Sequence, residues 1–235
     1  RGLEILSEIR KFGITCDWVE LRVDYITEPF LSELAGLGVR TIFMGWESGN
    51  AGTLKRIAKG FSPGTILEKT RILAKFSSLT VDASAIVGFP WESEKEIADT
   101  VSLMLEMFRV NPFRLNFNIG LYVPYPGAPV TAEAESRGFA FPGDHRGWSD
   151  YDILAGTLEL PWLTRRQVER YRLVDRYAKM LFVPPTLAAP LRIACRALAA
   201  VAFLRIRYGV FALPFEIRLQ SAAIRFMLRA RSRRT

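Results

Sequence analysis

Strand-like and helical segments alternate through the first half of the chain, and this alternation restricts the fold more than any other feature. The four predicted strands cover residues 17–23, 40–45, 81–88 and 113–123. The connections between them are long enough for the right-handed crossovers that join parallel strands. The sequence therefore predicts an α/β fold with a parallel sheet, and four such units make half of an eight-stranded, TIM-like barrel.

Helical signals fill the gaps between these strands. The predicted helices occupy residues 2–12, 27–38, 50–59, 62–76 and 93–109. Ser62 with Pro63, and Ser93 with Glu96, are typical residues of helix N-termini. We expect three regions: a partial barrel over 1–130, an irregular connection over 131–160, and a helical, Arg-rich C-terminal extension over 161–235. Because the chain begins within a helix rather than a strand, we also expect further strands upstream, in the N-terminal part of a longer protein.

The positive charge is concentrated at the C-terminal end. The net charge is +8, but residues 190–235 alone contribute +9, with ten Arg, no Lys and the single acid Glu216. Arginines and apolar residues recur at helical spacing over 216–231, which suits a helix lying on an anionic membrane surface. A helix packed on the rest of the protein is an equal alternative. We expect no nucleic acid partner because the tail is rich in Phe, and the apolar runs are too short to span a bilayer.

The stretch 41–50 (TIFMGWESGN) is the best candidate for a ligand site. A predicted strand breaks at Gly45, presents the carboxylate of Glu47, and turns at Ser48 into a helix. Parallel α/β folds bind ligands at the carboxyl ends of their strands. The apolar run before Gly45 also predicts a strand covered on both faces. The alternative is that Glu47 and Ser48 only cap the next helix.

Three motifs together resemble the second half of a radical S-adenosylmethionine (SAM) domain, most closely that of cobalamin-binding radical SAM proteins. They are GWESG at 45–49 with a following helix that closes on KG at 59–60, IVGFPWES at 86–93, and PYPG at 124–127. Their order and spacing both match the family. The resemblance covers residues 2–130 well and 160–183 loosely.

The resemblance implies a set of SAM-binding residues. The residues implied are Glu47, Ser48, Lys59, Ile86, Val87 and Gly88. Glu47 would face the ribose or methionine part of SAM, Lys59 would meet its carboxylate, and Ile86 with Val87 would pack against adenine, with Gly88 allowing a close backbone approach. Lys59 also suits a helix C-terminus without any ligand.

Further substrate or SAM contacts are implied for Arg22, Tyr122 and Tyr125. A surface ion pair is an equal alternative for Arg22, and ordinary packing is an equal alternative for the two tyrosines. His145, the only histidine, lies in the expected irregular connection, and we do not favour it as a cobalt or catalytic ligand.

The chain also departs from the family. The CxxxCxxC motif that holds the 4Fe–4S cluster is missing, and Cys16 and Cys195 are the only cysteines. Trp91 and Ala128 stand where glycine and threonine are common, and Trp91 could narrow the pocket. We therefore expect no metal ligands in this chain, with the cluster, and cobalamin if it is bound, held by upstream regions.

The expected protein is a cytoplasmic radical SAM enzyme, methyltransferase- or cyclase-like, peripheral at the inner membrane surface if its tail binds lipid. This chain alone would be inactive, and it would contribute part of the SAM pocket and of the wall facing a small-molecule or lipid-like substrate. One alternative is a truncated, non-catalytic barrel that acts as a binding or membrane-surface module. An aldolase-like barrel is less favoured, because no Schiff-base lysine stands out after the strands.

Overall fold

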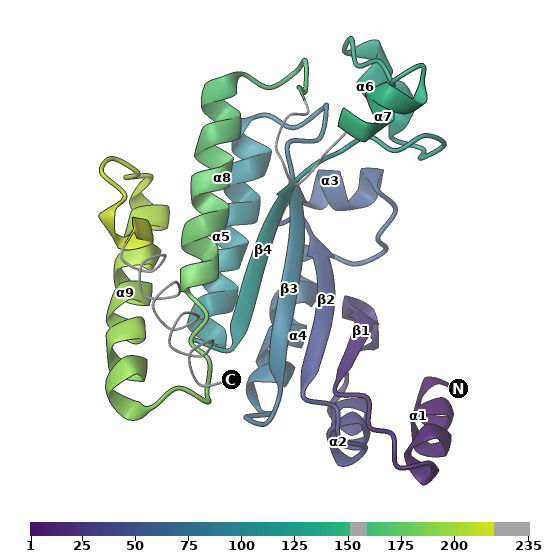
Figure 1. Cartoon of the computed structure of the whole chain (residues 1–235), viewed down its shortest axis with the longest axis vertical. Coiled ribbons are helices and arrows are strands. Elements are labelled where there is room, and N and C mark those ends of the chain that lie inside the picture. The colour runs from purple at the N-terminus through teal and green to yellow at the C-terminus, as the bar shows by residue number, and fades with distance from the viewer. Residues whose placement is uncertain (151–158, 219–235) are drawn as a thin grey trace.

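A computed structural model of the chain describes residues 1–150 and 159–218. Its centre is a parallel sheet in the order β1-β2-β3-β4 (Figure 1). The strands are β1 (Trp18–Arg22), β2 (Thr41–Glu47), β3 (Thr80–Val87) and β4 (Leu115–Leu121). The predicted α/β fold with a parallel sheet is therefore confirmed, and the half-barrel stays a prediction.

The helices begin where capping residues predict them. The helices of the α/β region are α1 (Gly2–Lys11), α2 (Glu28–Gly36), α3 (Ala51–Arg56), α4 (Pro63–Ala74) and α5 (Glu94–Val110), with a 3-10 turn, η1 (Val23–Tyr25). Ser62 caps α4 by accepting a hydrogen bond from the backbone N–H of Thr65. Ser93 and Glu96 form the predicted capping box at the start of α5.

The later part of the chain is also helical. It contains α6 (Thr131–Ser136), α7 (His145–Asp150), α8 (Arg165–Met180) and α9 (Ala189–Tyr208). The connection predicted to be irregular therefore includes two short helices. Helices of this length gain their stability from tertiary packing rather than from their own periodicity. In α6, the side chains of Thr131 and Ala134 are buried.

The two faces of the sheet differ in composition. In β2, Ile42, Met44 and Trp46 are buried in the core, whereas Phe43 is only half-buried. On the half-buried face, an Asn116 amide donates to the Asp82 carboxylate at 2.9 Å. In the described residues, β2 is thus fully buried on one face and half-buried on the other, because its side chains alternate between the two faces. Full cover on both faces stays a prediction.

The C-terminal helices belong to the same core as the sheet. Helix α8 packs along β4, and α9 packs outside α8 and α5 (Figure 1). Tyr177 of α8, Leu181 directly after that helix, and Ala202 and Ile206 of α9 are buried in the same cluster as the strands. One side of α9 therefore serves as a packing surface, while the two alternatives given for residues 216–231 stay predictions.

Within residues 1–150 and 159–218, no helix is both long enough and apolar enough to cross a bilayer. The amphipathic helix predicted over 216–231 lies almost wholly outside the described residues.

Candidate ligand site at the carboxyl ends of the strands

A cavity of about 370 Å³ lies where β2, β3 and β4 end. Volumes of this order are typical of small-molecule sites. The lining residues are Glu47, Ile57, Lys59, Ile86, Phe89, Leu121, Tyr122, Val123 and Tyr125. Helices α3 and α6 lie at the same end of the sheet (Figure 1). Five of the residues predicted from the motifs thus meet around one space: Glu47, Lys59, Ile86, Tyr122 and Tyr125.

Glu47 owes its position to an irregularity at the end of β2. The register with β3 shifts between Gly45 and Glu47, and Glu47 adopts a left-handed φ of 61°. Its carboxylate folds back over Gly45, where a Cβ atom would collide with the carboxylate oxygen. The Lys59 ammonium donates to Oε1 of Glu47 at 2.8 Å. The pair is only partly exposed, with 33% of the Lys59 side chain and 13% of the Glu47 side chain accessible.

Arg22 contacts the backbone of Lys59 rather than its side chain. Nη2 of Arg22 donates to the Lys59 carbonyl at 3.0 Å, and Nε of Arg22 pairs with Asp24 at 3.0 Å. The surface ion pair considered for Arg22 therefore forms. The side chain supports the turn that carries Lys59 and is not part of the cavity lining.

Three other predicted SAM-binding residues do not line the cavity. Ser48 is fully buried, with its hydroxyl 3.1 Å from that of Thr100 and accepting from the Asn50 N–H. Val87 is buried on the helix-facing side of β3, because its neighbour Ile86 points to the other face. Gly88 has a positive φ of 81° and turns the chain beyond β3. The predicted SAM contacts of Ser48 and Val87 therefore gain no support from their side chains.

Glu92 lies in the IVGFPWES motif and is a further candidate for the site, although the resemblance implied no role for it. Its carboxylate accepts hydrogen bonds from Gly88 N at 2.8 Å, Phe89 N at 3.2 Å and Thr53 Oγ1 at 3.0 Å. Desolvation raises the pKa of this carboxyl group, although the three hydrogen bonds oppose the effect. Glu92 therefore fixes the turn beside the cavity. The available signal was an acid four residues after the glycine that ends a strand.

Trp91 lies outside the cavity, so the prediction that it could narrow the pocket is wrong for this structure. Its ring stacks on Phe89 with centroids 4.9 Å apart, and the Arg56 guanidinium lies 4.4 Å from its ring centroid. Arg56 also pairs with Glu133 of α6 at 2.9 Å. These contacts join α3, the turn after β3 and α6.

The two tyrosines of the cavity have different environments. Tyr122 is 7% exposed, and its buried hydroxyl has no hydrogen-bond partner among the described residues. Its ring lies 4.7 Å from that of Phe89, and desolvation raises its pKa. Tyr125 is 56% exposed. Tyr122 thus offers a hidden hydroxyl, while Tyr125 offers an accessible ring.

The described residues contain no cluster of His, Cys, Asp and Glu that could hold a metal ion. Cys16 precedes β1 and donates its thiol to the Trp18 carbonyl, and Cys195 lies on α9. His145 is the first residue of α7 and is exposed. None of these three residues lines the cavity at the carboxyl ends of the strands, which we call the rim cavity.

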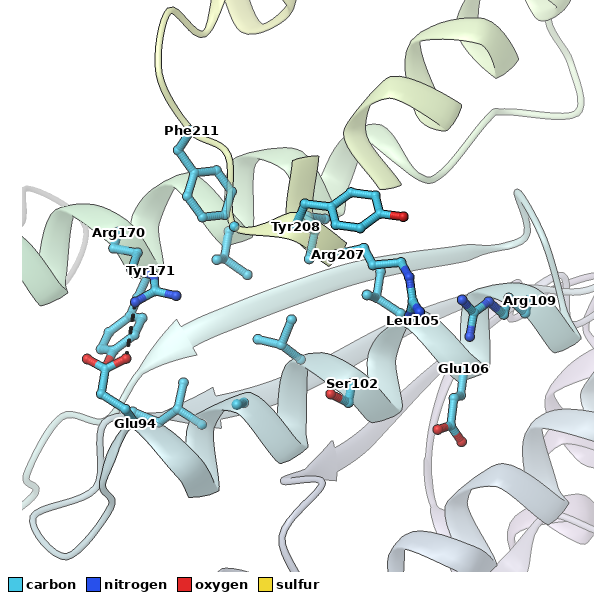
Figure 2. Close-up of a pocket in the computed structure, with 16 residues that line it drawn as sticks. Glu94, Ser102, Leu105, Glu106, Arg109, Arg170, Tyr171, Arg207, Tyr208 and Phe211 are labelled. Atoms are coloured by element: carbon cyan, nitrogen blue, oxygen red, sulfur yellow. Dashed lines mark hydrogen bonds and ion pairs between the residues drawn. The ribbon is translucent and has the colours of Figure 1, made fainter. Parts of the chain in front are cut away.

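A second cavity, of about 450 Å³, lies between α5, α8 and the end of α9 (Figure 2). At one end, Glu94 accepts from Arg170 at 3.2 Å and from the Tyr171 hydroxyl at 3.3 Å. Desolvation, together with Glu94, raises the pKa of Tyr171 to about 12. Because this cavity lies among helices rather than at the carboxyl ends of the strands, we assign the ligand site to the rim cavity.

These features define a parallel α/β protein with a candidate small-molecule site at the carboxyl ends of its strands. No family model matches the chain. The chain is 36% identical over 95 residues to tRNA-2-methylthio-N(6)-dimethylallyladenosine synthase of Pelobacter propionicus. The alignment covers 39% of this chain and 20% of the synthase, so the chain spans about a fifth of that relative.

Among solved structures, the chain is similar to coproporphyrinogen III oxidase (HemN) of Escherichia coli, which is described as a radical SAM enzyme. The TM-score is 0.42 at 18% sequence identity, over 49% of this chain and 26% of the oxidase.

Proposed function

We propose that this chain is part of a radical SAM enzyme and forms part of its SAM pocket and substrate wall. The observation that carries the proposal is the partly buried Glu47–Lys59 pair, which faces one cavity together with Ile86 and two tyrosines. The residues that line this cavity come from the three motifs at 45–60, 86–93 and 124–127, or lie directly beside them. The sequence similarity to a tRNA-modifying synthase supports an enzymatic role for the α/β region.

The residues at the rim fit the polar and apolar parts of SAM. The Lys59 ammonium can bind the methionine carboxylate, and the Glu47 carboxylate can accept from the ribose hydroxyls or the methionine ammonium. Ile86 offers an apolar surface for adenine. Since Lys59 and Glu47 bind each other at 2.8 Å, a ligand carboxylate would compete with Glu47 for Lys59. Bound SAM would supply the radical chemistry of the family at an unactivated carbon.

The chain does not fit an iron–sulfur cluster. A site-differentiated 4Fe–4S cluster of this family needs three converging thiolates, and the sequence has two distant cysteines. We therefore assign the cluster, and cobalamin if the enzyme uses it, to other regions of the protein. A methyl transfer or a cyclisation on a small or lipid-like substrate is the reaction class we propose.

Substitutions at the ion pair test the SAM assignment in the cluster-loaded enzyme. We expect Glu47→Gln and Lys59→Ala each to weaken SAM binding about tenfold or more, because each removes a charge-assisted hydrogen bond. The cluster absorbance should not change. Calorimetric titration with SAM measures the affinity, and absorbance spectroscopy measures the cluster.

Lys55→Ala is the matched control, since Lys55 is an exposed lysine on α3 outside the cavity. Its SAM affinity should equal that of the unmodified enzyme. If Glu47→Gln and Lys59→Ala also keep that affinity, the assignment of these two residues is incorrect.

A further inference from the structure

Helix α9 is apolar on two opposite sides. On its inner side, Ala199, Ala202 and Ile206 are buried against the core. On its outer side, exposed residues recur at spacings that keep them on one face. These residues and their exposures are Ile193 (69%), Val201 (37%), Leu204 (51%) and Tyr208 (69%). We call this set the outer stripe.

The outer stripe continues into the turn that follows the helix. Val210, Leu213 and Phe215 are exposed by 53%, 84% and 56%. Eight of the fifteen exposed large hydrophobic residues in the described part of the chain fall between positions 191 and 215. Helix α9 lies outermost, beyond α8 and α5 (Figure 1). Apolar concentrations of this kind mark surfaces that bind a protein or a membrane.

The charges carried by α9 and the turn after it are almost all positive, although Glu106 of α5 lines the same cavity as Arg207 and Tyr208. Between positions 190 and 218 the only acid is Glu216, which is 1% exposed and pairs with Arg205 at 2.7 Å. Arg196 and Arg207 are exposed and eleven residues apart, so they lie on one side of the stripe. The Arg196 guanidinium also lies 5.0 Å from the centroid of the Phe113 ring, and Arg207 also lines the second cavity. Arg207 and Tyr208 stand side by side at the end of the helix (Figure 2).

We propose that α9 binds an anionic lipid membrane through the outer stripe, lying parallel to the bilayer surface. An apolar face flanked by guanidinium groups is the arrangement that interfacial helices use. A spanning orientation is not available to α9, which has 20 residues but is not apolar enough to cross a bilayer. A second copy of this chain is the competing occupant, and the experiments below distinguish it from a membrane. This inference does not depend on the proposed SAM site.

Vesicle sedimentation with the full chain tests the apolar part of the surface. We expect binding to vesicles of equal phosphatidylglycerol and phosphatidylcholine, and much weaker binding to phosphatidylcholine alone. The double variant Val201→Glu with Leu204→Glu should lose about tenfold or more in vesicle affinity, because two carboxylates enter the apolar contact. Ile14→Glu is the control, since Ile14 is 58% exposed in the segment before β1.

Charge variants test the arginines separately. Arg196→Gln with Arg207→Gln should weaken binding about tenfold and reduce its dependence on salt. Arg166→Gln, at an exposed arginine of α8, should leave binding unchanged. Circular dichroism of each variant verifies that the fold is kept.

Three results would overturn the proposal. The first is that the full chain does not bind the vesicles, and the second is that binding survives in a folded Val201→Glu, Leu204→Glu variant. The third is a dimer in light scattering that dissociates in the same variant. That outcome would show that another copy of the chain covers the outer stripe.

Discussion

Glu92 illustrates how one buried carboxylate can shape the edge of a sheet. Its two oxygens accept from two backbone N–H groups of the turn after β3 and from Thr53 on α3. This turn carries Phe89, and the Phe89 ring contacts the ring of Tyr122 in the cavity. Because desolvation outweighs the hydrogen bonds, the pKa of Glu92 lies above its ordinary value of 4.5. The charged form is therefore less favourable in the folded protein than in the unfolded chain.

This shift predicts the direction of a pH effect. The contribution of Glu92 to stability should be complete below pH 4.5 and should be lost as pH rises through the raised pKa. Glu92→Gln should remove this part of the pH dependence. Glu92→Ala should lower the free energy of unfolding by about 2 kcal/mol or more, because it leaves backbone N–H groups without an acceptor.

Urea unfolding between about pH 4 and 8 measures both effects. Glu68→Gln is a suitable control, since the Glu68 side chain is 62% exposed. If the unmodified chain and Glu92→Gln show the same pH dependence, Glu92 does not titrate as the structure implies.

The elements show which features a sequence can reveal. Strand and helix positions depend on local periodicity, and capping residues such as Ser62 and Ser93 act within one turn, so both were predictable. The meeting of Glu47 and Lys59 was predictable only through the resemblance to a family. The stacking of Trp91 on Arg56 was not, because it depends on how α3 and the turn after β3 approach each other in three dimensions.

Helix α8 also provides a hydrogen-bond acceptor for the edge of the sheet, which its periodicity does not indicate. β4 is the last strand of the sheet, so its outer edge has backbone groups without a strand partner. The Asp175 carboxylate of α8 accepts a hydrogen bond from the Ile119 N–H at 2.9 Å. A side chain from the helix thus satisfies part of the strand edge, which fixes α8 against the sheet.

Asp175→Ala should lower the free energy of unfolding by about 1–3 kcal/mol, because it leaves the Ile119 N–H unpaired beneath α8. Asp175→Asn keeps an oxygen acceptor and should cost less.

The exposed Lys179, which pairs with Asp175 at 2.7 Å, allows the ion pair to be tested alone. Lys179→Ala should cost under about 1 kcal/mol. Denaturant titration of the three variants distinguishes the backbone contact from the ion pair, and equal losses in Asp175→Ala and Lys179→Ala would contradict the role of the backbone contact.

At the scale of the whole molecule, the two sides of the sheet have separate roles. One side packs with helices from both halves of the chain into a common core. The other carries half-buried or exposed polar side chains such as Glu20, Ser84 and Asn118. Parallel sheets are usually covered on both faces. The polar face therefore agrees with the proposal that other regions of the protein complete the site.

The positions of the two cysteines give a prediction for this 235-residue chain. Cys16 precedes the amino end of β1, whereas the candidate site lies at the carboxyl ends of the strands, and Cys195 lies on α9. Two thiolates so placed cannot converge with a third on one cluster. After anaerobic incubation with iron and sulfide, the chain should show no stoichiometric 4Fe–4S absorbance and no SAM cleavage. Cys16→Ser and Cys195→Ser should behave in the same way. A stoichiometric cluster with SAM turnover in this chain would refute the assignment of the cluster to other regions of the protein.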